Sequence, residues 1–131
     1  MHPIDIALQI ATRAHAEQLD RDGYPVILHP LTVGLMGHTD EEKIAGFLHD
    51  VVEDSDYTFD DLLQAGIPVG VVNALRLLTH QKDVPYYDYV QHIIDSDNPI
   101  ALQVKYNDLQ HNFARGKAYP ELQQKHGPAL E

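Results

Sequence analysis

The stretch Phe47–Asp54 constrains the fold of this chain more than any other segment. Within six positions it carries four side chains that handle metals or protons, His49, Asp50, Glu53 and Asp54, and apolar residues fill the gaps. On a helix, residues three or four apart share a face, so His49 would lie near Glu53. Burying such a cluster costs free energy unless something pairs with it, and a divalent cation is the natural partner. The simpler interpretation is a solvated acidic helix end.

Apolar residues recur at helical spacing along much of the chain, and no segment shows the strong alternation of a strand. Proline, glycine and capping residues divide the pattern into helices, among them Pro3 at a helix start, Thr58 as an N-cap and Gly66 as a stop. We expect helices at 3–18, 29–36, 39 or 40 through the acidic cluster, 58–66, 68–78, 86–95 and 99–113, and a short one around 121–125. The predicted fold is an all-α orthogonal helical bundle.

The composition favours one domain over residues 1–131, with a short last helix, because 44% hydrophobic residues suit a compact core. No apolar run approaches the roughly 20 residues that a membrane helix needs, and no signal peptide is recognisable. The absence of cysteine excludes disulfides and thiolate metal sites and is compatible with a reducing cytosol. We therefore expect a cytoplasmic protein with no membrane partner.

The charge of the chain limits its partners and its metals. A formal net charge of -11 argues against nucleic acid, since binding a phosphate backbone needs a basic face. A small phosphorylated ligand remains compatible, because a bound cation reverses the local field. Nine histidines and twenty acidic residues leave oxygen and imidazole as the strong ligands, which favours manganese, iron, zinc, magnesium or cobalt.

Two further segments carry chemistry-bearing residues at suggestive spacing. In Val104–Asn112, a helix would place Lys105, Asp108 and Asn112 on one face, although an ordinary amphipathic helix looks the same. In Pro25–Pro30, His29 stands at a helix start between apolar neighbours, where a lone histidine is more often a core residue than a ligand.

Taken together, these three segments resemble the HD-domain metal-dependent phosphohydrolases. The order of a loop histidine, an HDxxED motif and a KxxDxxxN motif is most similar to the RelA/SpoT-type alarmone hydrolase domain and its small stand-alone relatives. The similarity runs from about Ile4 to Asn112 and includes Ala14-His15, Gln18, Gly23-Tyr24-Pro25, Ile27, His29-Pro30, Leu48–Asp54, Lys105, Asp108 and Asn112. This resemblance implies one divalent cation, usually manganese, held by His29, His49, Asp50 and Asp108.

The resemblance also implies the reaction, which is hydrolysis of a phosphoester or pyrophosphate of a nucleotide such as guanosine tetraphosphate, at its 3′ pyrophosphate. Glu53 and Asp54 match the acidic pair that positions or deprotonates the attacking water and returns a proton to the leaving oxygen. Lys105 either neutralises phosphate charge or pairs with the acidic cluster. Asn112 corresponds to a position that contacts the nucleotide sugar.

Three positions depart from the alarmone hydrolases. Those enzymes commonly have a basic residue at Asp20, a glycine at Glu17 and a tyrosine at Val26, and the basic residue and the tyrosine face the nucleotide. Arg21, next to Asp20, is the remaining basic candidate for substrate binding. A C-terminal helix with basic and tyrosine contacts would have to come from Arg115, Lys117, Tyr119 and Lys125. A nucleotide-synthesising activity is not expected, because it needs a separate domain.

Two other functions compete with the hydrolase. A catalytically silent metal- or nucleotide-binding regulatory domain would explain the altered turn at Asp20, but such a domain has no need of the Glu53-Asp54 pair. A di-iron oxygenase of the same superfamily needs extra histidine ligands, for which His80 and His92 are the candidates.

The remaining histidines and the tyrosines receive simpler interpretations. We expect His15 and His111 to be structural and His38, His80, His92 and His126 to lie at the surface. Tyr86, Tyr87 and Tyr89 either stack on a base or form a core or interface stripe, and a tyrosine-bearing surface permits a homodimer.

Overall fold

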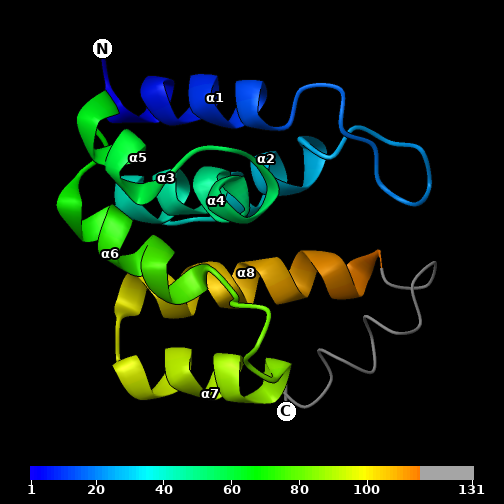
Figure 1. Ribbon diagram of the computed structural model, residues 1–131, viewed down its shortest axis with the longest axis vertical. Coiled ribbons are helices and arrows are strands. Elements are labelled where there is room, and N and C mark those ends of the chain that lie inside the picture. The colour runs from blue at the N-terminus through cyan, green and yellow to red at the C-terminus, as the bar shows by residue number, and fades with distance from the viewer. Residues whose placement is uncertain (116–131) are drawn as a thin grey trace.

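A computed structural model describes residues 1–115 and shows an all-helical architecture for them (Figure 1). In chain order the helices are α1 (Pro3–Ala14), α2 (Leu28–Leu35), α3 (Asp40–Leu48), α4 (Val51–Asp54), α5 (Phe59–Ala65), α6 (Val69–Leu78), α7 (Tyr86–Ser96) and α8 (Pro99–Ala114). The described residues contain no strand, only an isolated bridge between Leu19 and Pro25. The predicted all-α fold is therefore confirmed. The helix expected around 121–125 lies outside the described residues.

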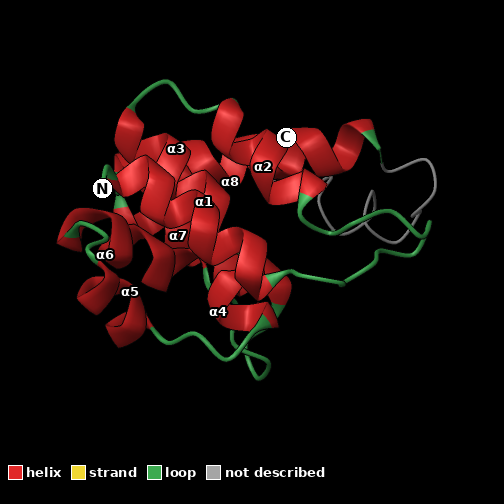
Figure 2. Ribbon diagram, turned by 90° about the horizontal axis from the view of Figure 1, so that it is seen from above, coloured by secondary structure: helices red, strands yellow, loops and turns green. Residues whose placement is uncertain are grey.

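Helix α3 is the centre of the bundle, because it packs against α1, α2, α6 and α8. Its last five residues, from Ile44 to Leu48, are all buried. Figure 1 shows α1 on one side of this helix and α8 with α7 on the other. Seen from above in Figure 2, the one-turn helix α4 lies beside α1, which it contacts. A side chain at the end of α3 therefore points into the middle of the molecule.

Two glycines allow α2 and α3 to approach closely. A Cβ atom added to Gly46 on α3 would lie 2.7 Å from the Cα atom of Gly34 on α2, and a Cβ atom on Gly34 would overlap the ring of Phe47. No larger residue fits at either position without moving a backbone or a buried ring. This contact joins the last turns of α2 and α3, and the ring centroids of His29 on α2 and His49 after α3 lie 5.2 Å apart.

Capping residues set several helix ends as the sequence predicts. The Thr39 side chain accepts a hydrogen bond from the Glu42 amide at the start of α3, and Thr58 forms a capping box with Asp61 at the start of α5. Gly66 ends α5 with φ of 106°, a left-handed conformation that favours glycine.

Helix α1 is shorter than the predicted 3–18 and ends at Ala14. Glu17 adopts φ of 66°, which a helix cannot contain. The Gln18 side chain then turns back, and its amide donates to the carbonyl oxygens of Ala14 at 3.1 Å and Asp54 at 3.0 Å. A left-handed residue at Glu17 gives a physical reason for the glycine expected there in alarmone hydrolases.

The prediction that one helix runs through the acidic cluster is wrong. Helix α3 ends at Leu48, His49 is its C-cap, and Asp50 has φ of -105° and ψ of -1° before α4 begins at Val51. The Nδ1 atom of His49 lies 2.7 Å from the carbonyl oxygen of Gly46, so the ring can bond a carbonyl group in the last turn of the helix. His49 is thereby separated from Glu53 and Asp54, which lie on a different helix.

No helix in the described part of the chain is long and apolar enough to cross a membrane.

Candidate metal centre and active site

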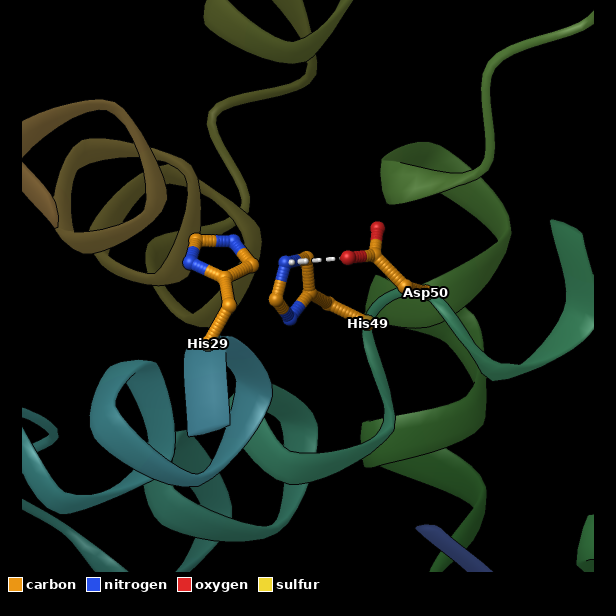
Figure 3. Close-up of side chains that lie close together, drawn as sticks. All are labelled: His29, His49 and Asp50. Atoms are coloured by element: carbon orange, nitrogen blue, oxygen red, sulfur yellow. Dashed lines mark ion pairs between the residues drawn. The ribbon is translucent and has the colours of Figure 1, made fainter. Parts of the chain in front are cut away.

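His29, His49 and Asp50 come together in the middle of the bundle (Figure 3). Their ligand atoms all lie within 4.8 Å of one another. His29 belongs to the first turn of α2, whereas His49 and Asp50 follow α3. Both histidines are buried, at 6% and 5% exposure, and their rings meet edge to face. Figure 3 shows Asp50 extending its carboxylate toward the ring of His49, and the Oδ2–Nε2 distance is 3.2 Å.

Asp108 from α8 completes this group. Its Oδ1 atom lies 2.7 Å from Nε2 of His29 and 3.3 Å from Nε2 of His49. The same carboxylate accepts hydrogen bonds from Lys105 Nζ at 3.0 Å and Asn112 Nδ2 at 3.1 Å. The four residues predicted as metal ligands thus converge from three parts of the chain that lie far apart in sequence.

The charges of this group favour a cation. Burial alone would raise the pKa of Asp108, but the Lys105 ammonium and the two histidines hold that pKa well below its usual value. Burial would lower the pKa of His49, yet Asp50 and Asp108 raise it well above its usual value. Both carboxylates therefore favour positive charge at the point where the Nε2 atoms converge.

The donor set fits a divalent metal ion. The Nε2 atom of His49 is buried and makes no hydrogen bond, although two carboxylates lie close to it. Its Nδ1 atom faces a carbonyl oxygen, which holds a proton on Nδ1, so Nε2 is the nitrogen that would give up its proton to bind a metal. Two imidazoles with two carboxylates form a mixed nitrogen and oxygen site of the kind that manganese, iron and zinc occupy.

Supporting hydrogen bonds hold the ligands in place, as outer partners commonly do around metals. The Nδ1 atom of His29 lies 2.7 Å from Nδ1 of His111, and the two rings stack. Burial, together with His29 and Arg115, lowers the pKa of His111 to about 4. A neutral His111 can accept a hydrogen bond from Nδ1–H of His29, which leaves the lone pair on Nε2 of His29 to ligate a metal. This arrangement agrees with the structural role predicted for His111.

Glu53 and Asp54 form a second, more exposed acidic group on α4. Partial burial, with Asp50 and Asp54 nearby, raises the pKa of Glu53, although a hydrogen bond from His80 opposes this. Partial burial and Asp50 also raise the pKa of Asp54. Carboxyls with raised pKa values are better suited to accept and return a proton near neutral pH.

Helix α4 is tied to the end of α1 through two side chains. Nδ1 of His15 bonds the side-chain oxygen of Gln18 at 3.0 Å, and the Gln18 amide donates to the backbone oxygen of Asp54. His15 is 2% exposed, so it supports this link from inside the core. The structural role predicted for His15 is consistent with these contacts.

Lys105 pairs with the acidic cluster, which is one of the two roles that the sequence leaves open. Its ammonium lies on Asp108 and about equally over the rings of Tyr86 and Tyr89, at 5.3 Å and 5.0 Å from their centroids. Burial would lower the pKa of Lys105, but Asp108 and the tyrosines raise it. Tyr86 and Tyr89 thus pack inside the molecule, as the core interpretation predicts, whereas Tyr87 is exposed.

Comparisons with known proteins agree with this geometry. No protein-family model matches the chain. A guanosine-3′,5′-bis(diphosphate) 3′-pyrophosphohydrolase of Aquifex aeolicus is 40% identical over 63 residues, which are 45% of this chain and 9% of that protein. A probable enzyme of the same name from Synechocystis is 48% identical over 52 residues, 37% of this chain and 7% of that protein. The chain spans less than a tenth of these relatives.

The arrangement of the helices decides the fold. The structure superposes with a TM-score of 0.76 and 23% identity on a metazoan ortholog of SpoT that hydrolyzes ppGpp, over 90% of this chain and 72% of the other. This chain has the fold of that SpoT ortholog. His49 and Asp50, which the resemblance in the sequence identifies with the HD motif, lie at the break between α3 and α4.

The turn around Asp20 is held by hydrogen bonds within the turn and by an ion pair to α8. The Asp20 carboxylate accepts the backbone amides of Asp22 and Tyr24 and lies 3.7 Å from Arg115 at the end of α8. Arg21, the predicted substrate contact, is exposed in the same turn.

Arg115, the C-cap residue of α8, is a basic residue that reaches this turn from the far end of the described chain. Its guanidinium donates twice to Oδ1 of Asn112, at 3.2 and 2.9 Å, while Asn112 itself donates to Asp108. The sequence named Arg115 only as one of several C-terminal candidates. Lys117, Tyr119 and Lys125 lie outside the described residues.

His80 is the residue near the site that sequence reasoning missed. Its backbone amide donates to Glu53, and its half-buried ring packs on Tyr89, so the prediction of a surface residue holds only in part. No motif marks His80, because its contact with Glu53 joins residues 27 positions apart. His38 and His92 are exposed as predicted, and His126 lies outside the described residues.

Proposed function

We propose that this chain is a metal-dependent phosphohydrolase that acts on a phosphorylated nucleotide, with removal of the 3′ pyrophosphate of guanosine tetraphosphate as its specific reaction. The observation that carries the proposal is the buried, unbonded Nε2 atom of His49 between Asp50 and Asp108. The pyrophosphohydrolase name of the Aquifex aeolicus relative supports the choice of substrate.

Four residues would hold the metal, namely His29, His49, Asp50 and Asp108. Manganese is our choice among the divalent ions that accept such a mixed donor set. When bound, a divalent ion supplies polarisation of a phosphoryl oxygen and acidification of water at neutral pH. Lys105 keeps Asp108 ionised, and His111 keeps His29 in the tautomer that presents Nε2.

Glu53 and Asp54 would carry out the proton transfers. One carboxylate positions or deprotonates the water whose oxygen attacks phosphorus, and the bond between phosphorus and the 3′ oxygen breaks. The pair returns the proton to the leaving 3′ oxygen. Their raised pKa values support this assignment, because a carboxyl titrating closer to neutral pH both accepts and releases a proton more readily.

Asn112, Arg21 and Lys105 remain our proposed substrate contacts, and Arg115 joins them because it bonds Asn112. The pairing of Lys105 with Asp108 limits its role to the charge that it contributes next to the metal. We further propose that residues 1–131 form one domain, that the protein is cytoplasmic, and that it can form a homodimer.

One experiment tests the function. Pyrophosphate and phosphate release from a panel of nucleotides, guanosine tetraphosphate included, is measured with manganese for the wild type, His49→Ala, Asp108→Ala and the surface control His38→Ala. Manganese-dependent release of pyrophosphate from guanosine tetraphosphate, lost in both site variants and kept in the control, is the expected result. Release from other phosphoesters alone would keep the hydrolase and reject this substrate.

The second candidate is the silent metal- or nucleotide-binding regulatory domain. The observation that favours it is the Asp20–Arg115 ion pair, since an acidic residue neutralises a guanidinium where alarmone hydrolases have a basic residue. Under this hypothesis the protein binds manganese and nucleotide with no product from any substrate, which the same panel, combined with calorimetric titration, distinguishes from turnover.

A further inference from the structure

We propose that His80 is a positioning residue that holds the Glu53 carboxylate at the metal centre through the loop between α6 and α7, residues 79–85. The inference rests on the proposed function, in which Glu53 handles the proton of the attacking water. His80 itself touches neither the reacting atoms nor the metal ligands in this assignment, and acts through Glu53.

Glu53 depends on this loop for its orientation. It is exposed, on a helix of only four residues, and its Oε1 atom accepts the backbone amide of His80 at 2.5 Å. Within residues 1–115 no other hydrogen bond to this carboxylate occurs. A bond to a charged acceptor is stronger than one between neutral groups, so the amide of His80 is the main restraint on the position of the carboxylate.

The ring of His80 fixes the loop that presents this amide. Its Nε2 atom donates to the carbonyl oxygen of Val84 at 2.6 Å and so links the two ends of the loop. The ring also stacks on Tyr89, with centroids 4.6 Å apart and planes 22° from parallel, and meets Tyr86 edge-on at 5.8 Å. Tyr89 is in turn bonded to the carbonyl oxygen of Leu78 at the end of α6.

The same two tyrosines cover the ammonium of Lys105, which is bonded to the proposed ligand Asp108. The two tyrosines therefore contact both His80, whose amide bonds Glu53, and Lys105, which bonds Asp108. This arrangement relates the position of the proposed base to the metal centre, and a general base must lie within hydrogen-bond reach of its proton.

The test uses substitutions that separate the ring's stacking from its hydrogen bond. His80→Phe keeps an aromatic ring on Tyr89 but removes the donor to Val84, whereas His80→Gln restores a donor. The matched control is His38→Phe, since the His38 amide also donates to a glutamate, Glu42, but far from the site. We expect kcat to fall about tenfold or more in His80→Phe, with partial recovery in His80→Gln and no change in the control.

A double-mutant comparison distinguishes positioning from general damage. In a Glu53→Gln background, His80→Phe should cause no further loss of kcat, because the residue through which it acts is already removed. Manganese affinity should match the wild type in His80→Phe, because the metal ligands are untouched. An unchanged kcat in His80→Phe, or an equal loss in the Glu53→Gln background, would overturn the inference.

A readout without turnover keeps the inference separate from the proposed reaction. In the wild-type spectrum the amide proton of His80 should be shifted downfield by its bond to the carboxylate, and this shift should shrink in Glu53→Gln, whose neutral oxygen is a weaker acceptor. His80→Phe should move the residue 80 amide upfield and speed its hydrogen exchange about tenfold or more, which is the loss of a bond worth about 1.5 kcal/mol. An amide unaffected by both substitutions would refute positioning, even if the enzyme proved active.

Discussion

The two halves of the candidate active site are built in different ways. The ligand half consists of His29, His49, Asp108 and the partly buried Asp50, and its first three members are 5–6% exposed and bonded from inside the bundle. The acid half, Glu53 and Asp54, is exposed on a four-residue helix and is tied down by one contact from a loop and one from the end of α1. Metal binding should therefore depend on the packing of the core, whereas proton transfer should depend on a few contacts near the surface. Substitutions should separate the two.

Removing the carboxylate of Asp108 should have the largest effect. Asp108→Ala leaves the Lys105 ammonium buried without its partner, so we expect a loss of about 3–5 kcal/mol in the free energy of unfolding, and loss of metal binding. Urea denaturation in the presence of a chelator measures the free energy of unfolding, and manganese titration measures metal binding. Asp95→Ala on the exposed side of α7 is the control and should change stability by less than about 0.5 kcal/mol. Wild-type stability in Asp108→Ala would contradict the coupling of this half to the core.

Glu53→Gln should leave the ligand half intact and disable the acid half. Turnover should fall by roughly 10²–10⁴, the usual contribution of a general base, while manganese affinity stays at the wild-type value. Steady-state kinetics and metal titration on one preparation measure both, with Glu41→Gln on the exposed first turn of α3 as the control. Loss of metal in Glu53→Gln would mean that the two halves are one unit.

Gly46→Ala tests the helix contact beneath the ligand half. Its methyl group would press on the Gly34 backbone, so we expect about 1–3 kcal/mol of destabilisation and a weaker metal site, because α2 and α3 carry different ligands. Gly70→Ala on α6 is the matched control, since nothing lies within 4 Å of the added carbon there. That control should stabilise by about 0.5–1 kcal/mol. Unfolding and metal titration of both variants decide the point.

Thr58→Ala should give the smallest effect and should leave both halves untouched. It removes the capping box of α5, worth about 1 kcal/mol, at a helix that supplies no site residue. Thermal unfolding measures the loss, and Thr12→Ala, a threonine bonded within α1 rather than at a cap, provides the comparison. A change in manganese affinity with Thr58→Ala would show that the ligand half responds to remote destabilisation.

Local signals in the sequence predict the fold well. Proline, threonine caps and Gly66 mark the ends of helices because each acts on its own neighbouring backbone. The errors occur where tertiary contacts end a helix. Helix α3 stops at Leu48 because the ring of His49 turns to a carbonyl of its own last turn and into the core.

The candidate site could be predicted only where motifs mark it. The residues named as ligands are those that the structure brings together. The contacts of His80 and Arg115 could not be predicted, because no local pattern encodes their bonds to Glu53, Asn112 and Asp20. The role of Lys105 needed the structure, since the choice between phosphate and Asp108 depends on where α7 places its tyrosines.

The contact between His29 and Asp108 joins residues 79 positions apart in the chain. Closing so long a segment costs entropy that only a nearly complete bundle repays, so the ligand set assembles late in folding. A metal ion consequently has little to bind in the early stages of folding and acts mainly by slowing unfolding once α8 has docked. Added manganese should therefore lower the unfolding rate and leave the refolding rate almost unchanged.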